Sequence, residues 1–184
     1  MSKPDLLIHT AFKLFYEHGI HAVGVNAILA ETGVAKKTLY RHFGSKDALV
    51  EAVLIYRDQV FMDWLISRMM AAGEGKSAIL ALFDALDDWF HDRVDVLLPF
   101  KGCFFVKANG AFSNHAVNDL CQKHKQNITS FIQANLVGCS SMLAPSDLAQ
   151  SISVLKEGAI SQAYVAGDLE AAKRAKAMAV ALLG

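Results

Sequence analysis

Proline and cysteine are both scarce in this sequence. Only three of the 184 residues are proline and twelve are glycine, while alanine and leucine are abundant. This composition, together with the lack of a convincing strand pattern, favours an all-α fold. The three cysteines, Cys103, Cys121 and Cys139, show no paired spacing. Neither a disulfide framework nor a zinc site is therefore expected, and a reducing, cytoplasmic setting is the simplest expectation.

Long apolar runs and an excess of charge of either sign are also missing. The longest uncharged run, residues 126–146, contains amides, hydroxyls and a proline, and the N-terminus lacks the pattern of a secretory signal. We therefore expect no membrane span and no leader. Lysine and arginine together number 18, as do aspartate and glutamate, so the chain as a whole is no polycation. A hydrophobic content of 53% indicates a globular protein.

Positive charge is nevertheless concentrated in one short segment. Residues 33–46 carry four lysines or arginines and no acid, whereas acids outnumber bases in residues 47–100. A basic patch on an otherwise balanced chain suits a polyanion that is contacted by one face only.

Apolar periodicity predicts about nine helices. Glycines at 19, 33 and 44 end the first three, and Ser45 is a good N-cap for a long fourth helix. The natural division lies near Gly44, which predicts domains at residues 1–45 and 46–184. The predicted helices are 5–18, 25–32, 36–42, 46–70, one ending near 92, 102–112, 115–137, one opening at LAPSD and one following the Gly167–Asp168 break.

The second and third predicted helices have the lengths and the glycine turn of a helix-turn-helix. A helical wheel places Leu39 inward, with Ala35 and Phe43 beside it. The other side chains of the third helix point outward or lie on its flanks, and they suit phosphates and base edges. Lys46, at the start of the next helix, adds a second anion site. The predicted DNA-binding residues are Lys36, Lys37, Thr38, Tyr40, Arg41, His42 and Lys46.

The stretch VNAILAETGVAKKTLYRHFGSKDALVEAVL resembles the N-terminal signature of the TetR family of ligand-responsive transcriptional repressors. About the first 55 residues carry this resemblance, and the layout of about nine helices extends it to the whole chain. The resemblance implies an N-terminal three-helix DNA-binding domain and a larger C-terminal helical domain for ligand binding and dimerisation. The matching residues are Val25, Ile28, Gly33, Val34, Thr38, Leu39, Tyr40, His42, Phe43, Ser45, Lys46, Asp47 and Leu49.

The resemblance also implies roles for single positions. Lys36, Lys37 and Thr38 would face bases or nearby phosphates. The residues that would hold phosphates are Tyr40, His42 and Lys46, with Arg41 available to either. Three positions depart from the family pattern. They are Gly24, where the family usually has a Thr or Ser N-cap, Leu29, where it has a small residue, and Lys37, where it often has glycine.

The remainder of the chain is rich in large aromatic residues. Each one alone is most simply part of a core, but as a set they could line an apolar cavity with a few polar groups. The segment GCFFVKANGAF loosely resembles a sixth-helix segment of one branch of the family, from which Lys107 and Ala111 depart. The candidate ligand-pocket residues are Phe61, Trp64, Phe83, Phe105, Asn109, Phe112 and His124.

The last two predicted helices have small or apolar faces that allow close helix packing. Internal packing alone would explain them, whereas the resemblance implies a dimer interface of four helices, two from each chain. A dimer also suits DNA, because two half-sites add the specificity that one short helix lacks. The candidate interface residues are Leu148, Ile152, Leu155, Gly158, Ala159, Ala172, Ala175 and Ala179.

The leading hypothesis is a homodimeric transcriptional regulator, a repressor released from a palindromic DNA operator by a small-molecule effector. No cofactor, metal or catalytic residue is expected. One alternative is a helical interaction module whose basic helix binds protein. The other is a helical enzyme, for which HDRVD at His91 could suggest acid–base or metal chemistry, although the seven histidines are scattered and form no catalytic spacing.

Overall fold

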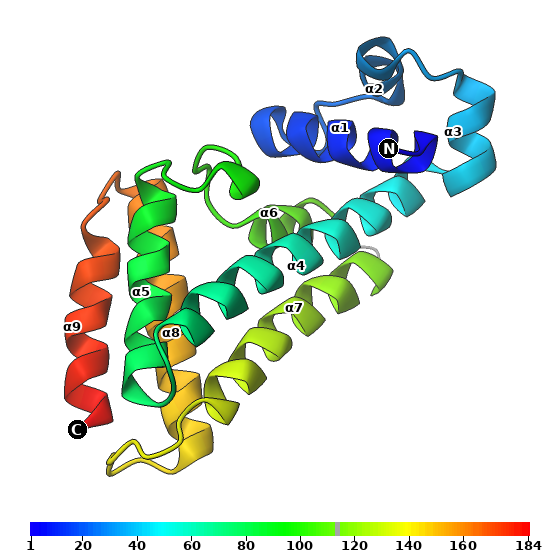
Figure 1. Cartoon of the computed structure of the whole chain (residues 1–184). Helices are drawn as coiled ribbons and strands as arrows, with labels where there is room; N and C mark the ends of the chain where they lie inside the picture. Colours follow the sequence, from blue (N-terminus) through cyan, green and yellow to red (C-terminus); the bar gives the residue numbers. More distant parts are fainter. Residues whose placement is uncertain (113–114) are drawn as a thin grey trace. The chain divides into compact units, whose positions relative to one another are not determined.

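The computed structural model describes residues 1–112 and 115–184. Within these residues the protein contains helices and no strand, so the predicted all-α fold is confirmed (Figure 1). The elements are α1 (Lys3–His18), α2 (Val25–Thr32), α3 (Lys36–Phe43), α4 (Lys46–Ala71), α5 (Lys76–Phe90), the 3₁₀ turn η1 (Asp95–Leu97), α6 (Phe104–Ala111), α7 (His115–Ala134), α8 (Pro145–Val165) and α9 (Ala171–Leu183).

The ends of the helices follow local capping chemistry. Helix α1 begins two residues earlier than predicted, because Ser2 and Asp5 form a reciprocal capping box. The Asp5 N–H donates to Ser2 Oγ at 3.3 Å, and the Ser2 N–H donates to the Asp5 carboxylate at 3.1 Å. Helix α4 is capped as predicted, since the Ala48 N–H donates to Ser45 Oγ at 3.0 Å.

The chain divides into two compact units. Unit 1 comprises Met1–Gln59 and Phe104–His124, and unit 2 comprises Val60–Cys103 and Lys125–Gly184. Helices α4 and α7 each contribute residues to both units. The predicted division into domains at residues 1–45 and 46–184 stays a prediction.

The core of unit 1 holds the N-terminal helices together. Leu7 and Phe15 of α1, Leu39 of α3, and Leu49 and Val53 of α4 are fully buried. Burying each such side chain contributes about 1.5–3 kcal/mol. The small helix α3 therefore depends on packing in this core, including its contacts with α1, because eight residues are too few to form a stable helix alone.

The core of unit 2 is built around α5, α8 and α9, which lie side by side in Figure 1. Helix α5 is buried along much of its length and α9 packs against both α5 and α8. Alanines on α9 lie at the contact, where a methyl side chain lets two helix backbones approach closely. The buried residues of α9 are Ala171, Ala172, Ala175, Ala179 and Leu183.

This packing corrects the predicted dimer interface. Six of the eight predicted residues are at most 6% exposed. Of the other two, Leu155 is half-buried and Gly158 is exposed. Seven of the eight, all except Gly158, face the core of unit 2, because α8 and α9 use their small faces to pack within the chain. The residues concerned are Leu148, Ile152, Leu155, Ala159, Ala172, Ala175 and Ala179.

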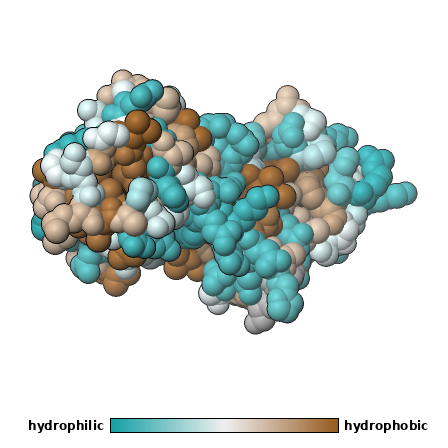
Figure 2. All heavy atoms as spheres, turned by 90° about the horizontal axis from the view of Figure 1, so that it is seen from below, coloured by the Kyte–Doolittle hydropathy of each residue, from teal (hydrophilic) through white to brown (hydrophobic). Residues whose placement is uncertain are grey.

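The outer faces of α8 and α9 nevertheless carry exposed apolar side chains. Val154 and Val165 of α8 are 68% and 79% exposed, and Met178 of α9 is 58% exposed. Figure 2 shows apolar patches among polar ones at its left, where α5, α8 and α9 lie. No helix of the described residues combines the length and apolarity that crossing a membrane requires.

The glycine between α2 and α3 provides a test of this fold. Gly33 has a φ of +66°, and a Cβ there would meet no atom within 4 Å. We expect Gly33→Ala to lower the free energy of unfolding by about 1 kcal/mol, because only the left-handed backbone opposes it. Thermal and denaturant unfolding would measure the change.

The matched control is Gly110→Ala. Gly110 lies inside α6 with a helical backbone and equally open space. There the substitution should raise the free energy of unfolding by about 0.5–1 kcal/mol. A shift of the same sign in both variants would contradict the assignment of strain to Gly33.

Candidate nucleic-acid interface and candidate ligand cavity

The turn that joins α2 to α3 is fixed by three local hydrogen bonds. The Gly33 N–H donates to the Leu29 carbonyl at 2.9 Å and closes the end of α2. The Thr32 hydroxyl donates to the Ile28 carbonyl at 2.8 Å and accepts from the Val34 N–H at 3.3 Å. The direction in which α3 leaves this turn is therefore set by the backbone and by the Thr32 side chain.

The inner face of α3 differs in one position from the helical wheel. Leu39 is completely buried and Phe43 is half-buried, as predicted. Ala35 is exposed, which corrects its predicted inward position. The reason is that Ala35 is the N-cap, with φ −64° and ψ 140°, so it precedes the helix and the wheel does not apply to it.

The outer face of α3 presents cationic and hydrogen-bonding groups to solvent. Lys36, Lys37, Arg41 and His42 are exposed, and Tyr40 is 41% exposed. Thr38 is half-buried, and the Lys36 ammonium lies 6.0 Å from the centre of the Tyr40 ring. In the described part of the chain, no acid forms an ion pair with Lys36, Lys37 or Arg41. The positive charge of this face is thus not neutralised within the protein.

The first turn of α3 is also open to an anion. No side chain caps it, and it contains no acidic residue. The first N–H groups of a helix have no partner within the helix, and together they carry partial positive charge. Helix α2 likewise lacks a side-chain cap, because Gly24 stands at its N-cap position. That agrees with the departure noted in the sequence at this residue.

Lys46 has a different environment from the other predicted DNA-binding residues. Its ammonium donates to the Ile20 carbonyl at 2.7 Å and lies 5.7 Å from the centre of the Phe15 ring. Burial lowers the pKa of Lys46. In this position it ties the start of α4 to the segment that follows α1, and its contact with phosphate stays a prediction.

Four of the predicted ligand-pocket residues, Phe105, Asn109, Phe112 and His124, belong to unit 1. Phe105 stacks on the His124 ring with a centroid distance of 3.6 Å, and His124 Nδ1 lies 2.6 Å from Asp58 Oδ1. Phe112 stacks on His21 at 5.2 Å, and Asn109 is exposed. Phe105 and His124 are thus brought together, whereas Asn109 points to solvent.

The other three predicted pocket residues belong to unit 2. The Phe61 ring packs edge-on against Trp64 and Trp89, with ring-centroid distances of 5.2 Å and 5.6 Å. Phe83 is buried in the same core. Such edge-to-face pairs stabilise a packed aromatic core. These residues are therefore accounted for by packing within unit 2, and their role toward a ligand stays a prediction.

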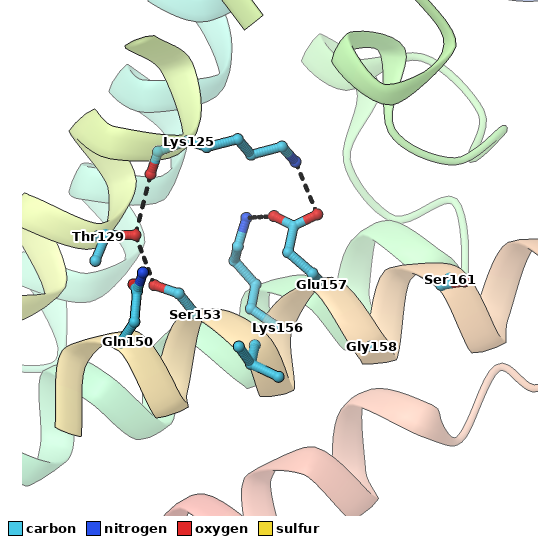
Figure 3. A pocket seen from close by; sticks show the side chains of 9 residues that line it. Lys125, Thr129, Gln150, Ser153, Lys156, Glu157, Gly158 and Ser161 are labelled. Carbon is cyan, nitrogen blue, oxygen red and sulfur yellow. Dashed lines mark hydrogen bonds and ion pairs between the residues drawn. The ribbon is translucent and has the colours of Figure 1, made fainter. Parts of the chain in front are cut away.

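A cavity of about 590 Å³ lies on the surface formed by α7 and α8 in unit 2 (Figure 3). Its size is in the range of small-molecule sites. None of the predicted pocket residues lines it. The lining residues are Lys125, Thr129, Gln150, Ser153, Val154, Lys156, Glu157, Gly158 and Ser161.

Two lysines hold one glutamate between them in this cavity. Lys125 Nζ donates to Glu157 Oε2 at 2.7 Å, and Lys156 donates to Glu157 Oε1 (Figure 3). Burial would raise the pKa of Glu157, but Lys156 and then Lys125 outweigh it and lower that pKa to about 2. Burial lowers the pKa of Lys156, which is only 2% exposed. Sequence reasoning missed this group because Lys125 lies 32 residues before Glu157.

The histidine of the HDRVD segment lies in a further polar cluster in unit 2. Ligand atoms of Asp87, His91 and Glu170 lie within 4.8 Å of one another. However, Arg93 pairs with Asp87 at 2.6 Å, and Lys173 lies 3.8 Å from it. Positive charge beside Asp87 disfavours a metal cation, so the geometry does not favour the metal chemistry considered for this segment.

The N-terminal helices are similar to those of known regulatory proteins. Residues 7–53 match the family model described as bacterial regulatory proteins, tetR family. The HTH-type transcriptional repressor KstR2 of Mycolicibacterium smegmatis is 40% identical over 67 residues, covering 36% of this chain and 31% of that protein. The HTH-type transcriptional activator FasR of the same species is 29% identical over 123 residues, covering 62% and 53%. The chain thus spans about a third to a half of the length of these relatives.

The whole fold is also similar to a solved structure. SCO4454, a TetR-family transcriptional regulator from Streptomyces coelicolor, aligns with a TM-score of 0.82 at 25% identity, covering 97% of this chain and 87% of that one. The match to the N-terminal helices and the match to the full helical arrangement agree. In its N-terminal segment and in its fold, this chain is therefore similar to bacterial regulatory proteins of the tetR family.

Proposed function

We propose that this protein is a transcriptional regulator that binds duplex DNA through α3. The observation that carries the proposal is the exposed outer face of α3, whose cations have no acidic partner in the described residues. An α-helix fits the major groove of B-DNA, where the N-terminal residues of a recognition helix reach base edges. Lys36, Lys37 and Thr38 occupy that end of α3, and Tyr40, Arg41 and His42 follow as phosphate contacts.

We further propose that the protein acts as a homodimer on a palindromic operator. One short helix reads few base pairs, and a two-fold dimer places a second one in the next major groove, about 34 Å away. The exposed apolar residues Val154, Val165 and Met178 provide a surface that a second copy would cover. They replace the buried residues that the sequence suggested for this role.

A small molecule would change the affinity for DNA by favouring one conformation of the dimer. Helix α4 has residues in both compact units, so a ligand that alters one end of α4 can bias the other. By linkage, DNA would weaken the binding of that ligand by the same factor. One similar protein is named a repressor and another an activator, so we propose repression only as the simpler of the two modes.

Neutral substitutions on the outer face of α3 test the DNA proposal. We expect Lys37→Gln and Arg41→Gln to weaken binding to a duplex that the protein selects from a random pool. Each lost phosphate contact should reduce the slope of log K against log salt by about 1. Fluorescence anisotropy at several salt concentrations would measure both quantities. Lys173→Gln, which removes an exposed lysine of α9, is the control, and equal affinity of all three variants would refute the proposal.

Lys46 provides a second test, because its ammonium already donates to the Ile20 carbonyl. We expect Lys46→Met to lower the free energy of unfolding by about 1 kcal/mol, since the Ile20 carbonyl loses its donor. The salt slope of DNA binding should stay unchanged, in contrast to Lys37→Met. If Lys46→Met instead reduced the slope by about 1 with no loss of stability, the ammonium would be a phosphate contact.

The dimer surface is tested by placing a charge on it. We expect Val165→Glu and Met178→Glu to raise the dimer dissociation constant at least about tenfold, because an unpaired carboxylate would be buried between the two chains. Sedimentation equilibrium measures this. Val106→Glu, at a similarly exposed position on α6, should leave the dimer intact. Equal dimer stability in all three variants would show that the interface lies elsewhere.

A further inference from the structure

The cavity between α7 and α8 contains an unbalanced set of charges. Lys125 and Lys156 are both bonded to Glu157, which is the one carboxylate in its lining. The remaining hydrogen-bond partner of Lys125 is the sulfur of Cys103 at 3.3 Å, and a thiol is a weak acceptor. The cluster of two ammonium groups and one carboxylate therefore carries an excess of one positive charge when all three are ionised.

Of the charged groups in this cavity, Lys156 would be stabilised most by an additional anion. It is 2% exposed, and Glu157 is its one hydrogen-bond partner among the described residues. A lysine ammonium has three N–H donors, so two of them remain unused in a largely dry position. A buried charge that is incompletely paired is unfavourable, and repulsion from Lys125 adds to the burial that already lowers the pKa of Lys156.

The rest of the lining is suited to an organic molecule rather than a simple ion. The cavity volume of about 590 Å³ is far larger than an inorganic anion needs. Thr129 and Ser153 hydrogen-bond to each other at 2.9 Å beside the lysines, as Figure 3 shows. Gln150 adds an amide, and Val154 adds an apolar side chain. These groups can contact a body of mixed polarity.

We propose that this cavity binds a small organic carboxylate. The carboxylate accepts hydrogen bonds from Lys156 and Lys125 and balances the single excess charge, and the rest of the molecule lies against Thr129, Ser153 and Gln150. A phosphate carries about two charges at neutral pH and would overcompensate the cluster. The assignment of this ligand as the effector rests on the proposed function, whereas the binding site itself does not.

The cavity also adjoins the proposed dimer surface. Val154, Gly158 and Ser161 line it and are exposed on α8, the helix that carries Val165. A second copy on this face would lie beside the bound carboxylate. Ligand binding would then change the contacts between the two chains, which is a physical route from the cavity to the spacing of the DNA-binding helices.

Direct titration of the full chain tests the site without DNA. Acetate and benzoate are the probes, acetamide and benzamide are their uncharged counterparts, and inorganic phosphate tests a general anion site. Isothermal titration calorimetry or NMR should show at least about tenfold tighter binding of at least one carboxylate than of its amide, in the millimolar range or below for ligands this small. Equal binding of acid and amide, tighter binding of phosphate, or binding of neither carboxylate would overturn the proposal.

Variants with opposite expected effects separate a binding role from a structural one. Lys156→Met should weaken carboxylate binding at least about tenfold, because the charge is lost while an apolar chain of similar length fills the space. Glu157→Gln should strengthen it several-fold, because the lysines lose their internal anion. Lys173→Met and Glu170→Gln alter an exposed pair on α9 in the same ways and should have no effect. A loss of binding in both Lys156→Met and Glu157→Gln would indicate a structural role and overturn the proposal.

Two further readings keep the outcomes distinct. Circular dichroism and thermal unfolding show whether Lys156→Met is folded. If Lys156→Met is unfolded, the carboxylate affinity of Glu157→Gln is compared with that of Glu170→Gln. Stronger binding by Glu157→Gln alone supports the site, and equal binding by the two variants refutes it. Fluorescence anisotropy of labelled DNA with and without benzoate then separates the proposed carboxylate site from the proposed DNA-binding function. DNA binding without any carboxylate binding refutes the site alone. Carboxylate binding without any DNA binding supports the site and refutes the proposal that the protein is a DNA-binding regulator.

Discussion

Helix α3 is held in place by a left-handed turn on one side and a single fully buried leucine on the other. Gly33 sets the direction in which the chain leaves α2, and Leu39 anchors the helix against the core of unit 1. Leu39 and the half-buried Phe43 form the inner face of α3, so the exposed Lys37, Arg41 and His42 are not needed for packing. That is why an eight-residue helix can present so many cationic and hydrogen-bonding groups outward, and why their charge requires no acidic partner within the chain.

Charge is treated in opposite ways in the two compact units. On α3 the cations are exposed, so water solvates them and they cost little until DNA replaces that water. In the cavity of unit 2, Lys156 is buried, and its charge must be compensated by neighbours such as Glu157. Exposed charge suits a large polyanion that arrives from outside, whereas a buried and incompletely paired charge suits a small ligand of opposite sign.

Small residues on α8 and α9 had two possible uses, and the structure distinguishes them. Alanine lets helices pack closely whether the second helix belongs to the same chain or to another, so the sequence pattern is the same in both cases. Here Ala172, Ala175 and Ala179 pack inside unit 2. The outer surface carries Val154 and Val165, whose exposed valines are less conspicuous in the sequence than the alanines.

The sequence by itself determined what depends on neighbours along the chain. Helix periodicity, the glycine ends, the Ser45 cap and the outward cations of α3 are all properties of a few adjacent residues, and they were predictable for that reason. The tertiary structure decided which residues from distant segments meet. Lys46 reaches the Ile20 carbonyl, and Lys125 of α7 meets Glu157 of α8. Neither contact has a local signal, because it depends on how whole helices pack and not on the order of residues within one of them.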